Sequence, residues 1–265
     1  MYNGDPDPIT NWPLYICRVF VKWICYLLFG VSSLVLVIVV FPIMSLLFHP
    51  KERFSRYVRR FISGSFRWYF IQFMALFQVV KVDVEDRKAF RNLSSKIVVC
   101  NHPSHLDVVM MISLIPNADV IVRGSLTRNF FLQGVVNRLY ILSSLDFEVL
   151  ANSCIESLNR ENCLVVFPQG TRTPRSGEIK LKKGAARIAL MSGKKIVPVY
   201  IGGNDKWGLG KHDPIFAFNH TDKYIYRIRM QEEIDPEKYA DLSMPLAVRR
   251  LNEEIRKIFL NPSNK

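Results

Sequence analysis

The sequence has 265 residues and a hydrophobic fraction of 49%, which is enough for one large α/β domain with a packed core and excludes a disordered chain. Lys and Arg outnumber Asp and Glu by 36 to 23, a formal net charge of +13 that suits nucleic acid, an anionic membrane surface or phosphorylated substrates, or serves solubility alone. The five cysteines include no Cys-x-x-Cys pair, so they support neither a metal site nor a disulfide framework.

The N-terminal region is predicted to hold a tail at residues 1–22 and a membrane helix at residues 23–48. No charged residue occurs from Trp23 to Phe48, a run longer than the roughly 20 residues that an α-helix needs to cross a bilayer. The length of this run and the acidic start of the chain argue against a cleaved signal peptide. Gly30 and Pro42 leave a kinked or re-entrant hairpin open as an alternative to a full crossing.

Basic residues flank the apolar run unequally. Arg18 and Lys22 precede it, and six follow it: Lys51, Arg53, Arg56, Arg59, Arg60 and Arg67. Positive residues stay on the cytoplasmic side of a membrane, so the rest of the chain is expected to face the cytoplasm, at the inner membrane if the source is bacterial.

Residues 49–82 combine arginines with aromatic and aliphatic side chains. This pattern is typical of a basic amphipathic helix in the headgroup region of a membrane, with its arginines on anionic lipid. A second apolar helix packed on the domain explains the pattern equally well.

Residues 83–265 alternate between strand and helix patterns. Strands are predicted at 96–100, 119–122, 163–167, 195–201 and 224–230, and helices at 106–114, 183–191 and 245–259. This alternation predicts an α/β fold with a mixed, largely parallel sheet flanked by helices.

The block Asn101-His-Pro-Ser-His-Leu-Asp107 directly follows an apolar strand. Sites in such sheets lie at the carboxyl ends of strands. A turn entering a helix can bring His102 and Asp107 together, and an imidazole held by a carboxylate is a competent general base near neutral pH. The spacing alone is weak evidence, but its position after a strand strengthens it.

A second block, Phe167-Pro-Gln-Gly-Thr-Arg172, also ends an apolar strand. Gly170 allows close backbone approach to a ligand, Thr171 offers a hydroxyl, and Arg172 can bind a phosphate through two nitrogens. Four further basic residues follow: Arg175, Lys180, Lys182 and Lys183. An exposed basic loop is the alternative, and the neighbouring His-x4-Asp block favours a phosphate pocket.

With these blocks, the chain resembles the glycerolipid acyltransferases typified by bacterial lysophosphatidate acyltransferase. The resemblance covers roughly residues 95–205. It includes the blocks at 101–107 and 167–172, the stretch at 122–134, the segment at 181–189 and the strand at 196–201.

The resemblance implies that His102 deprotonates an acceptor hydroxyl while Asp107 orients and stabilises its imidazole. The alkoxide would attack an acyl thioester of coenzyme A or acyl carrier protein directly, with no metal and no other cofactor. The acceptor is most simply 1-acyl-glycerol-3-phosphate, which gives phosphatidic acid. The residues implied in substrate binding are Arg123, Gln169, Gly170, Thr171, Arg172 and Lys183, with residues 197–201 bordering the acyl chain.

Three positions depart from the family pattern. Gln169 stands where Glu is usual, Arg123 where Lys is usual, and Phe130 where Pro is usual. The departures concern acceptor recognition, so a non-glycerolipid hydroxyl (an aminolipid or a polyene-type product) stays open as the acceptor.

Other classes of protein remain as alternatives. A lipid hydrolase would use Ser104 or Ser125 as nucleophile, although the chain has no Gly-x-Ser-x-Gly elbow. A catalytically degenerate lipid-binding homologue is suggested by Gln169. Nucleic-acid binding has no support beyond net charge, so the expected partners are membrane lipids and an acyl donor.

Overall fold

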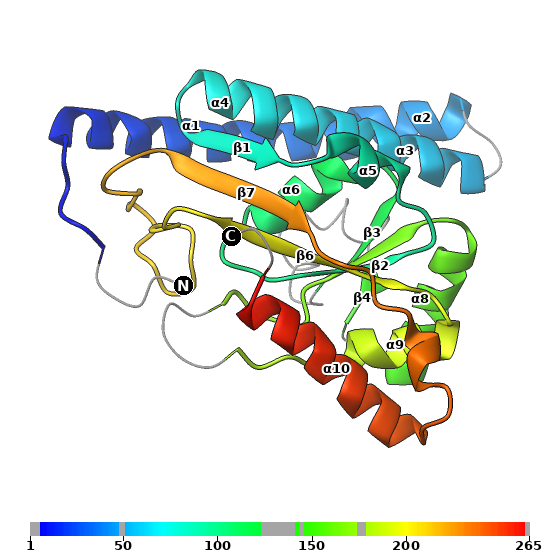
Figure 1. Ribbon diagram of the computed structural model, residues 1–265. Coiled ribbons are helices and arrows are strands. Elements are labelled where there is room, and N and C mark those ends of the chain that lie inside the picture. The colour runs from blue at the N-terminus through cyan, green and yellow to red at the C-terminus, as the bar shows by residue number, and fades with distance from the viewer. Residues whose placement is uncertain (1–5, 48–50, 123–140, 144–145, 174–178, 263–265) are drawn as a thin grey trace.

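The computed structural model describes residues 6–47, 51–122, 141–143, 146–173 and 179–262 (Figure 1). A seven-stranded sheet forms its centre, with the order β1-β7-β6-β2-β5-β3-β4. Only β6 and β7 pair antiparallel; the other neighbours are parallel, which confirms the predicted mixed, largely parallel sheet. The strands are β1 (Val80–Val84), β2 (Ile97–Cys100), β3 (Ala118–Val122), β4 (Ile141–Leu142), β5 (Cys163–Val166), β6 (Ile196–Gly203) and β7 (Tyr224–Met230).

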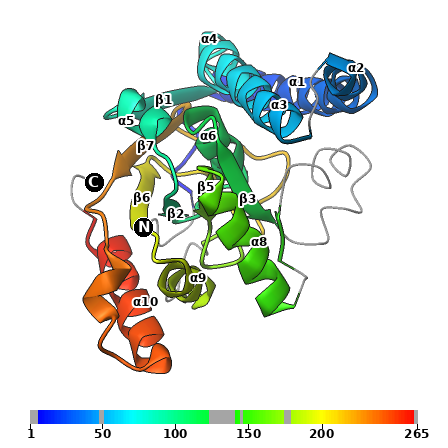
Figure 2. The same cartoon turned by 90° about the vertical axis from the view of Figure 1, so that its right-hand side faces the viewer.

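The central strands are apolar on both faces because helices cover the sheet on both sides. In β2, Val98 and Cys100 belong to one core cluster, and Ile97 and Val99 to the other. The first cluster lies under α5 (Arg87–Asn92), α6 (Asp107–Leu114) and the N-terminal helices. The second lies under α8 (Phe147–Asn159), α9 (Gly184–Ser192) and α10 (Met244–Leu260), which Figure 2 shows on the opposite side. A short 3-10 helix, η4 (Pro236–Tyr239), leads to α10.

The N-terminal apolar segment is one long helix, composed of α1 (Trp12–Val35), a π-helical stretch η1 (Leu36–Val40) and α2 (Phe41–Leu47). Within the described residues, it alone is long and apolar enough to cross a membrane, over Trp12–Leu47. Its outer side carries a row of exposed apolar side chains: Ile16, Phe20, Leu27, Val31, Ile38 and Leu46. This row gives the helix an apolar outer face along its length.

The predicted boundary between tail and helix at residue 23 is wrong. The helix begins at Trp12, where the Asn11 side chain accepts a hydrogen bond from the backbone N–H of Leu14. The prediction placed the start of the helix after the charged residues Arg18 and Lys22, but the structure buries both against the rest of the protein. Arg18 pairs with Asp222 at 3.2 Å, so these charges do not mark an exposed end of a membrane span.

The segment predicted as residues 49–82 also differs from expectation. It forms α3 (Lys51–Phe66), a π-helical stretch η2 (Arg67–Phe73) and a last turn α4 (Met74–Leu76), running beside α1 (Figure 1). Val58 and Ile62 are buried in the first core cluster, so one side of this segment packs on the domain, as the alternative expected of it. Arg59 pairs with the buried Asp119 at 2.7 Å rather than with lipid.

The start of the sheet corrects the other boundary. Strand β1 begins at Val80 and pairs with β7, so the domain predicted to start at residue 83 starts before it. The helical segment has already ended at Leu76.

Candidate active site

The two polar blocks meet because the strands that precede them are neighbours. β2 and β5 pair in parallel, with Val99 opposite Val166, so the residues that follow each strand emerge at one edge of the sheet. The backbone N–H of His102 donates to Gln169 Oε1 at 3.1 Å, and the N–H of Thr173 donates to the carbonyl of His102 at 2.7 Å. The predicted adjacency of the blocks is therefore present in the structure.

His102 and Asp107 contact each other directly. Nδ1 of His102 lies 2.8 Å from Oδ2 of Asp107, the first residue of α6. A carboxylate can only accept, so Nδ1 carries the hydrogen and the lone pair lies on Nε2. The Asp107 side chain is fully buried, whereas that of His102 is 14% exposed. The imidazole is thus oriented with Nε2 as its basic nitrogen.

A series of hydrogen bonds through Ser104 and Tyr226 holds the Asp107 carboxylate in place. The Ser104 hydroxyl donates to Asp107 Oδ1 at 2.6 Å, and the Ser104 N–H donates to Oδ2 at 2.7 Å. Because the single hydroxyl hydrogen of Ser104 goes to Asp107, the Tyr226 hydroxyl, 2.7 Å away, must donate to Ser104. Ser104 is fully buried in this chain and unavailable as a nucleophile, which removes it from the hydrolase alternative.

Lys206 lies behind Tyr226, and both were missed in the sequence analysis. Lys206 Nζ sits 4.7 Å from the centre of the Tyr226 ring and donates to the carbonyl of Ile225 at 2.8 Å. Burial lowers the pKa of Lys206 to about 8, although Asp107 opposes that shift. Burial and then the charge of Asp107 raise the pKa of Tyr226 well above its usual value, so the phenol keeps its hydrogen.

The depressed pKa of Lys206 predicts a pH dependence of stability. Below pH 8 the amine is charged in both folded and unfolded chains; between about 8 and 10.5 only the unfolded chain holds the proton. The free energy of unfolding should therefore rise with pH across this window, by on the order of 2–3 kcal/mol. Urea unfolding from pH 7 to 10.5 should show this rise in the wild type and not in Lys206→Met. Equal slopes for the two proteins would contradict it.

The second block forms a tight turn lined with cations. Gly170 has a φ of +64°, and an added Cβ would lie 3.0 Å from Nζ of Lys182. Arg172 Nη1 donates to the carbonyl of Gly210 at 2.6 Å and to that of Leu209 at 3.2 Å. Lys182 is therefore the basic residue that covers the turn at Gly170, while Arg172 is bonded to the segment at Leu209 and Gly210.

The other predicted binding residues are placed as follows. Lys183 stands at the start of α9 with an exposed side chain, one residue beyond the lysine that covers the turn. Thr171 lies within the turn and is half-buried. Arg123 and the stretch around Phe130 fall outside the described residues.

The orientation of Gln169 follows from its partners. Its Oε1 accepts from the backbone N–H of His102 and from the Thr173 hydroxyl, 2.9 Å away. A backbone N–H can only donate, so the atom facing it must be the amide oxygen. Nε2 is buried and has no hydrogen-bond partner among the described residues. Gln169 therefore supports the backbone of His102 and presents a neutral donor where a Glu would present an oxygen.

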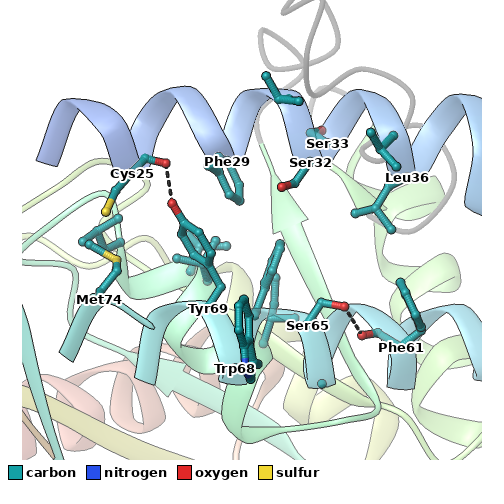
Figure 3. Close-up of a pocket in the computed structure, with 18 of the residues that line it drawn as sticks. Cys25, Phe29, Ser32, Ser33, Leu36, Phe61, Ser65, Trp68, Tyr69 and Met74 are labelled. Carbon is teal, nitrogen blue, oxygen red and sulfur yellow. Dashed lines mark hydrogen bonds between the residues drawn. The ribbon is translucent and has the colours of Figure 1, made fainter. Parts of the chain in front are cut away.

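An apolar cavity of about 1080 Å³ lies beside the loop at residues 101–107 that carries His102, the candidate catalytic loop. Figure 3 shows the α1–η1 helix on one side of it, with Phe29 and Leu36, and the α3–η2 segment on the other, with Phe61, Trp68 and Tyr69. His105 and Leu106 of the catalytic loop and Val109 of α6 also line it. The cavity thus joins the apolar helices to the loop that carries His102.

Comparisons with known proteins agree with this arrangement. Residues 81–202 match the family model described as Acyltransferase, a span that includes the paired blocks and most of the central strands. Over this span the chain is similar to the glycerolipid acyltransferases. The crystal structure of the 1-acyl-sn-glycerophosphate (LPA) acyltransferase PlsC from Thermotoga maritima superimposes with a TM-score of 0.66 and 20% identity, covering 94% of this chain and 100% of that one.

Curated relatives support the same family. The chain is 28% identical over 141 residues to the human 1-acyl-sn-glycerol-3-phosphate acyltransferase beta, covering 49% of this chain. It is 26% identical over 201 residues to the chloroplastic 1-acyl-sn-glycerol-3-phosphate acyltransferase BAT2 of Brassica napus, covering 70% of this chain. The chain spans about half the length of these two relatives, 50% and 54%.

Proposed function

We propose that this protein transfers a fatty acyl group from an acyl thioester to a hydroxyl of a lysophospholipid, with 1-acyl-glycerol-3-phosphate as the acceptor and phosphatidic acid as the product. The observation that carries the proposal is the His102–Asp107 contact of 2.8 Å beside the Gly170–Arg172 turn. The pair supplies a base, and the turn supplies donors for a phosphate.

The chemistry follows from the orientation of His102. Nε2 takes the proton of the acceptor hydroxyl as its oxygen attacks the thioester carbonyl, and Asp107 stabilises the imidazolium that forms. A new C–O bond forms, the C–S bond breaks, and the departing thiolate takes the proton from the imidazolium. A thioester is already activated, so the proposal needs no metal. Among the described residues, no group of three or more His, Cys, Asp or Glu could hold one.

The acceptor phosphate fits the cationic turn. Arg172 and Lys182 contribute positive charge there, and because Gly170 has no side chain, Lys182 Nζ lies close to the backbone of the turn. Gln169 adds no negative charge, and its unpaired Nε2 hydrogens suit a phosphate or carbonyl oxygen. Arg123 and Lys183 remain proposed contributors, as does Thr171.

Membrane attachment belongs to the proposal. The exposed apolar row on Trp12–Leu47 suits contact with lipid, and membrane lipids would be both surroundings and substrate. We place the catalytic domain on the cytoplasmic side, where coenzyme A or acyl carrier protein would deliver the donor.

We assign the cavity between α1 and α3 to the acyl chain, which predicts an effect of filling it. Gly64 of α3 lines the cavity, and a Cβ built on it meets nothing within 4 Å. Gly64→Leu should cut kcat/KM for an 18-carbon donor about tenfold relative to a 12-carbon donor, because the added side chain shortens the space. The helix itself should not suffer, since Leu forms helices better than Gly.

The measurement is thiol release from acyl-coenzyme A donors of 12 to 18 carbons. Gly64→Ala is the matched control: it adds one methyl group and should leave the chain-length preference nearly unchanged. An unchanged preference in Gly64→Leu would assign the acyl chain to another place.

The function itself is tested by giving the purified protein oleoyl-coenzyme A and lysophosphatidic acid. Release of free thiol and appearance of phosphatidic acid are expected. Failure with lysophosphatidic acid but success with another lipid hydroxyl would move the acceptor to the non-glycerolipid class. No thiol release with any lipid hydroxyl would favour the degenerate lipid-binding alternative.

A further inference from the structure

Tyr26 of the apolar helix α1 contacts the catalytic loop. Its hydroxyl lies 2.7 Å from Nε2 of His105, and the two ring centres are 5.6 Å apart. His105 stands three residues after His102, and its side chain lines the cavity and contacts α1. This contact is the polar link between the apolar helix and the loop that carries the base.

The other side of the His105 ring holds a turn of the chain. Nδ1 lies 3.1 Å from the carbonyl oxygen of Leu209, which also accepts from the His105 backbone N–H at 3.2 Å. A carbonyl can only accept, so Nδ1 carries the hydrogen and Nε2 accepts from Tyr26. The His105 side chain is exposed where it lines the cavity, but the surrounding protein desolvates its ring; this desolvation, followed by the nearby charge of Arg172, lowers its pKa to about 4. His105 is therefore neutral at physiological pH, as this arrangement requires.

Arg172 binds the same turn. Its Nη1 donates to the carbonyls of Leu209 and Gly210, at 3.2 and 2.6 Å. The carbonyl of Leu209 thus receives hydrogen bonds from both His105 and Arg172. One guanidinium nitrogen is occupied by the turn, and the position of the turn sets where the rest of the guanidinium lies.

Helix α1 holds this loop at a second place. Nζ of Lys22, one turn before Tyr26, donates to the carbonyl of Ile215 at 2.9 Å and also to that of Ala217. Within the loop, the Asp213 carboxylate accepts from the backbone N–H groups of Gly208 and Gly210, each at 2.9 Å. The loop that carries the partners of Arg172 is therefore bonded to α1 directly through Lys22, and indirectly through His105 at Leu209.

We propose that Tyr26 and His105 are positioning residues for acceptor binding: through the Leu209–Gly210 turn, they place Arg172 for the acceptor phosphate and make that placement depend on the packing of α1. This inference rests on the proposed function, in which Arg172 binds the phosphate. Helix α1 is then a structural part of the acceptor site as well as an apolar anchor.

The experiment compares variants of the full-length protein with lysophosphatidic acid in phosphatidylcholine vesicles and oleoyl-coenzyme A as donor. Tyr26→Phe should raise the KM for lysophosphatidic acid about fivefold, the effect of one lost hydrogen bond, with kcat within twofold and the donor KM unchanged. Tyr15→Phe makes the same change on the same helix, where the ring packs against His220, and should leave all three constants as in the wild type.

His105 variants test the direction of the coupling. His105→Leu should raise the acceptor KM more than Tyr26→Phe does, because it removes both side-chain hydrogen bonds. His105→Asn can still donate to the carbonyl of Leu209 and should restore part of the affinity. Adding Tyr26→Phe to His105→Leu should change nothing further, since the tyrosine acts through the histidine.

Arg172→Ala separates the inference from the proposed function. If Arg172→Ala raises the acceptor KM at least tenfold while Tyr26→Phe does not raise it, the positioning role is overturned and the phosphate role of Arg172 stands. If Arg172→Ala leaves the acceptor KM unchanged, both are overturned. Equal rises in the donor and acceptor KM of Tyr26→Phe would show general loosening of the site and would also overturn the inference.

Discussion

Replacing His102 by alanine should lower kcat for thiol release at least about 1,000-fold, because the substitution removes the proposed base. The fold should survive, since the side chain is partly exposed and the turn around it is held by backbone atoms. The His102 carbonyl still accepts from Thr173 at 2.7 Å, and its N–H still donates to Gln169 at 3.1 Å. The thermal midpoint should therefore stay within a few degrees of the wild type.

His220→Ala is the matched control for this loss. His220 lies on the surface loop that meets the N-terminal segment, where Nδ1 is 2.6 Å from the carbonyl of Asp7. It should retain activity. Mass spectrometry of lipids from cells carrying the wild type or His102→Ala should identify the missing product, and identical lipid profiles together with retained thiol release would show that His102 is not the base.

Asp107→Asn should lower kcat by about 100- to 10,000-fold while altering the shape of the site very little. Both carboxylate oxygens of Asp107 accept hydrogen bonds, from His102, from the Ser104 N–H and from the Ser104 hydroxyl. An asparagine offers one oxygen and one NH₂ group, so one of these donors must face another donor. If the imidazole adopts the tautomer with its hydrogen on Nε2 to avoid this clash, Nε2 loses the lone pair that the proposed mechanism needs.

The measurement is kcat from pH 5 to 9, with circular dichroism as the check on folding. Asp86→Asn is the control because Asp86 also stands at a helix N-terminus, where it accepts from the N–H groups of Lys88 and Ala89, and Asn caps helices equally well. Activity of Asp107→Asn within tenfold of the wild type would rule out a role for the carboxylate in orienting the base.

The sequence was most informative where local pattern and chemistry coincide. The β-branched runs before the two polar blocks are β2 and β5, and the strand at 224–230 was predicted with the bounds that the structure gives. The His102–Asp107 contact was also predictable, because five residues across a turn into a helix bring two side chains together. Strand β1 and helix α8 were missed, since short or mixed patterns do not distinguish strand, helix and loop.

The predicted N-terminal boundaries failed for a physical reason. The start of the membrane helix was placed after Arg18 and Lys22, on the assumption that these charged side chains are solvated. Instead, each has a partner more than 190 positions away in the sequence. Arg18 forms an ion pair with Asp222, and Lys22 donates a hydrogen bond to the carbonyl of Ile215. No local pattern records partners so distant.

What the sequence by itself determined is the class of fold and the likeness to the acyltransferases, because strand alternation and the His-x4-Asp block are patterns that extend over a few residues. Only the tertiary structure decided the surroundings of that pair. Tyr226 stands 122 residues from Ser104 in the chain, and Tyr26 stands 79 residues from His105. Such contacts form when a sheet and its covering helices bury their apolar faces together, and side chains meet there that share no local sequence signal.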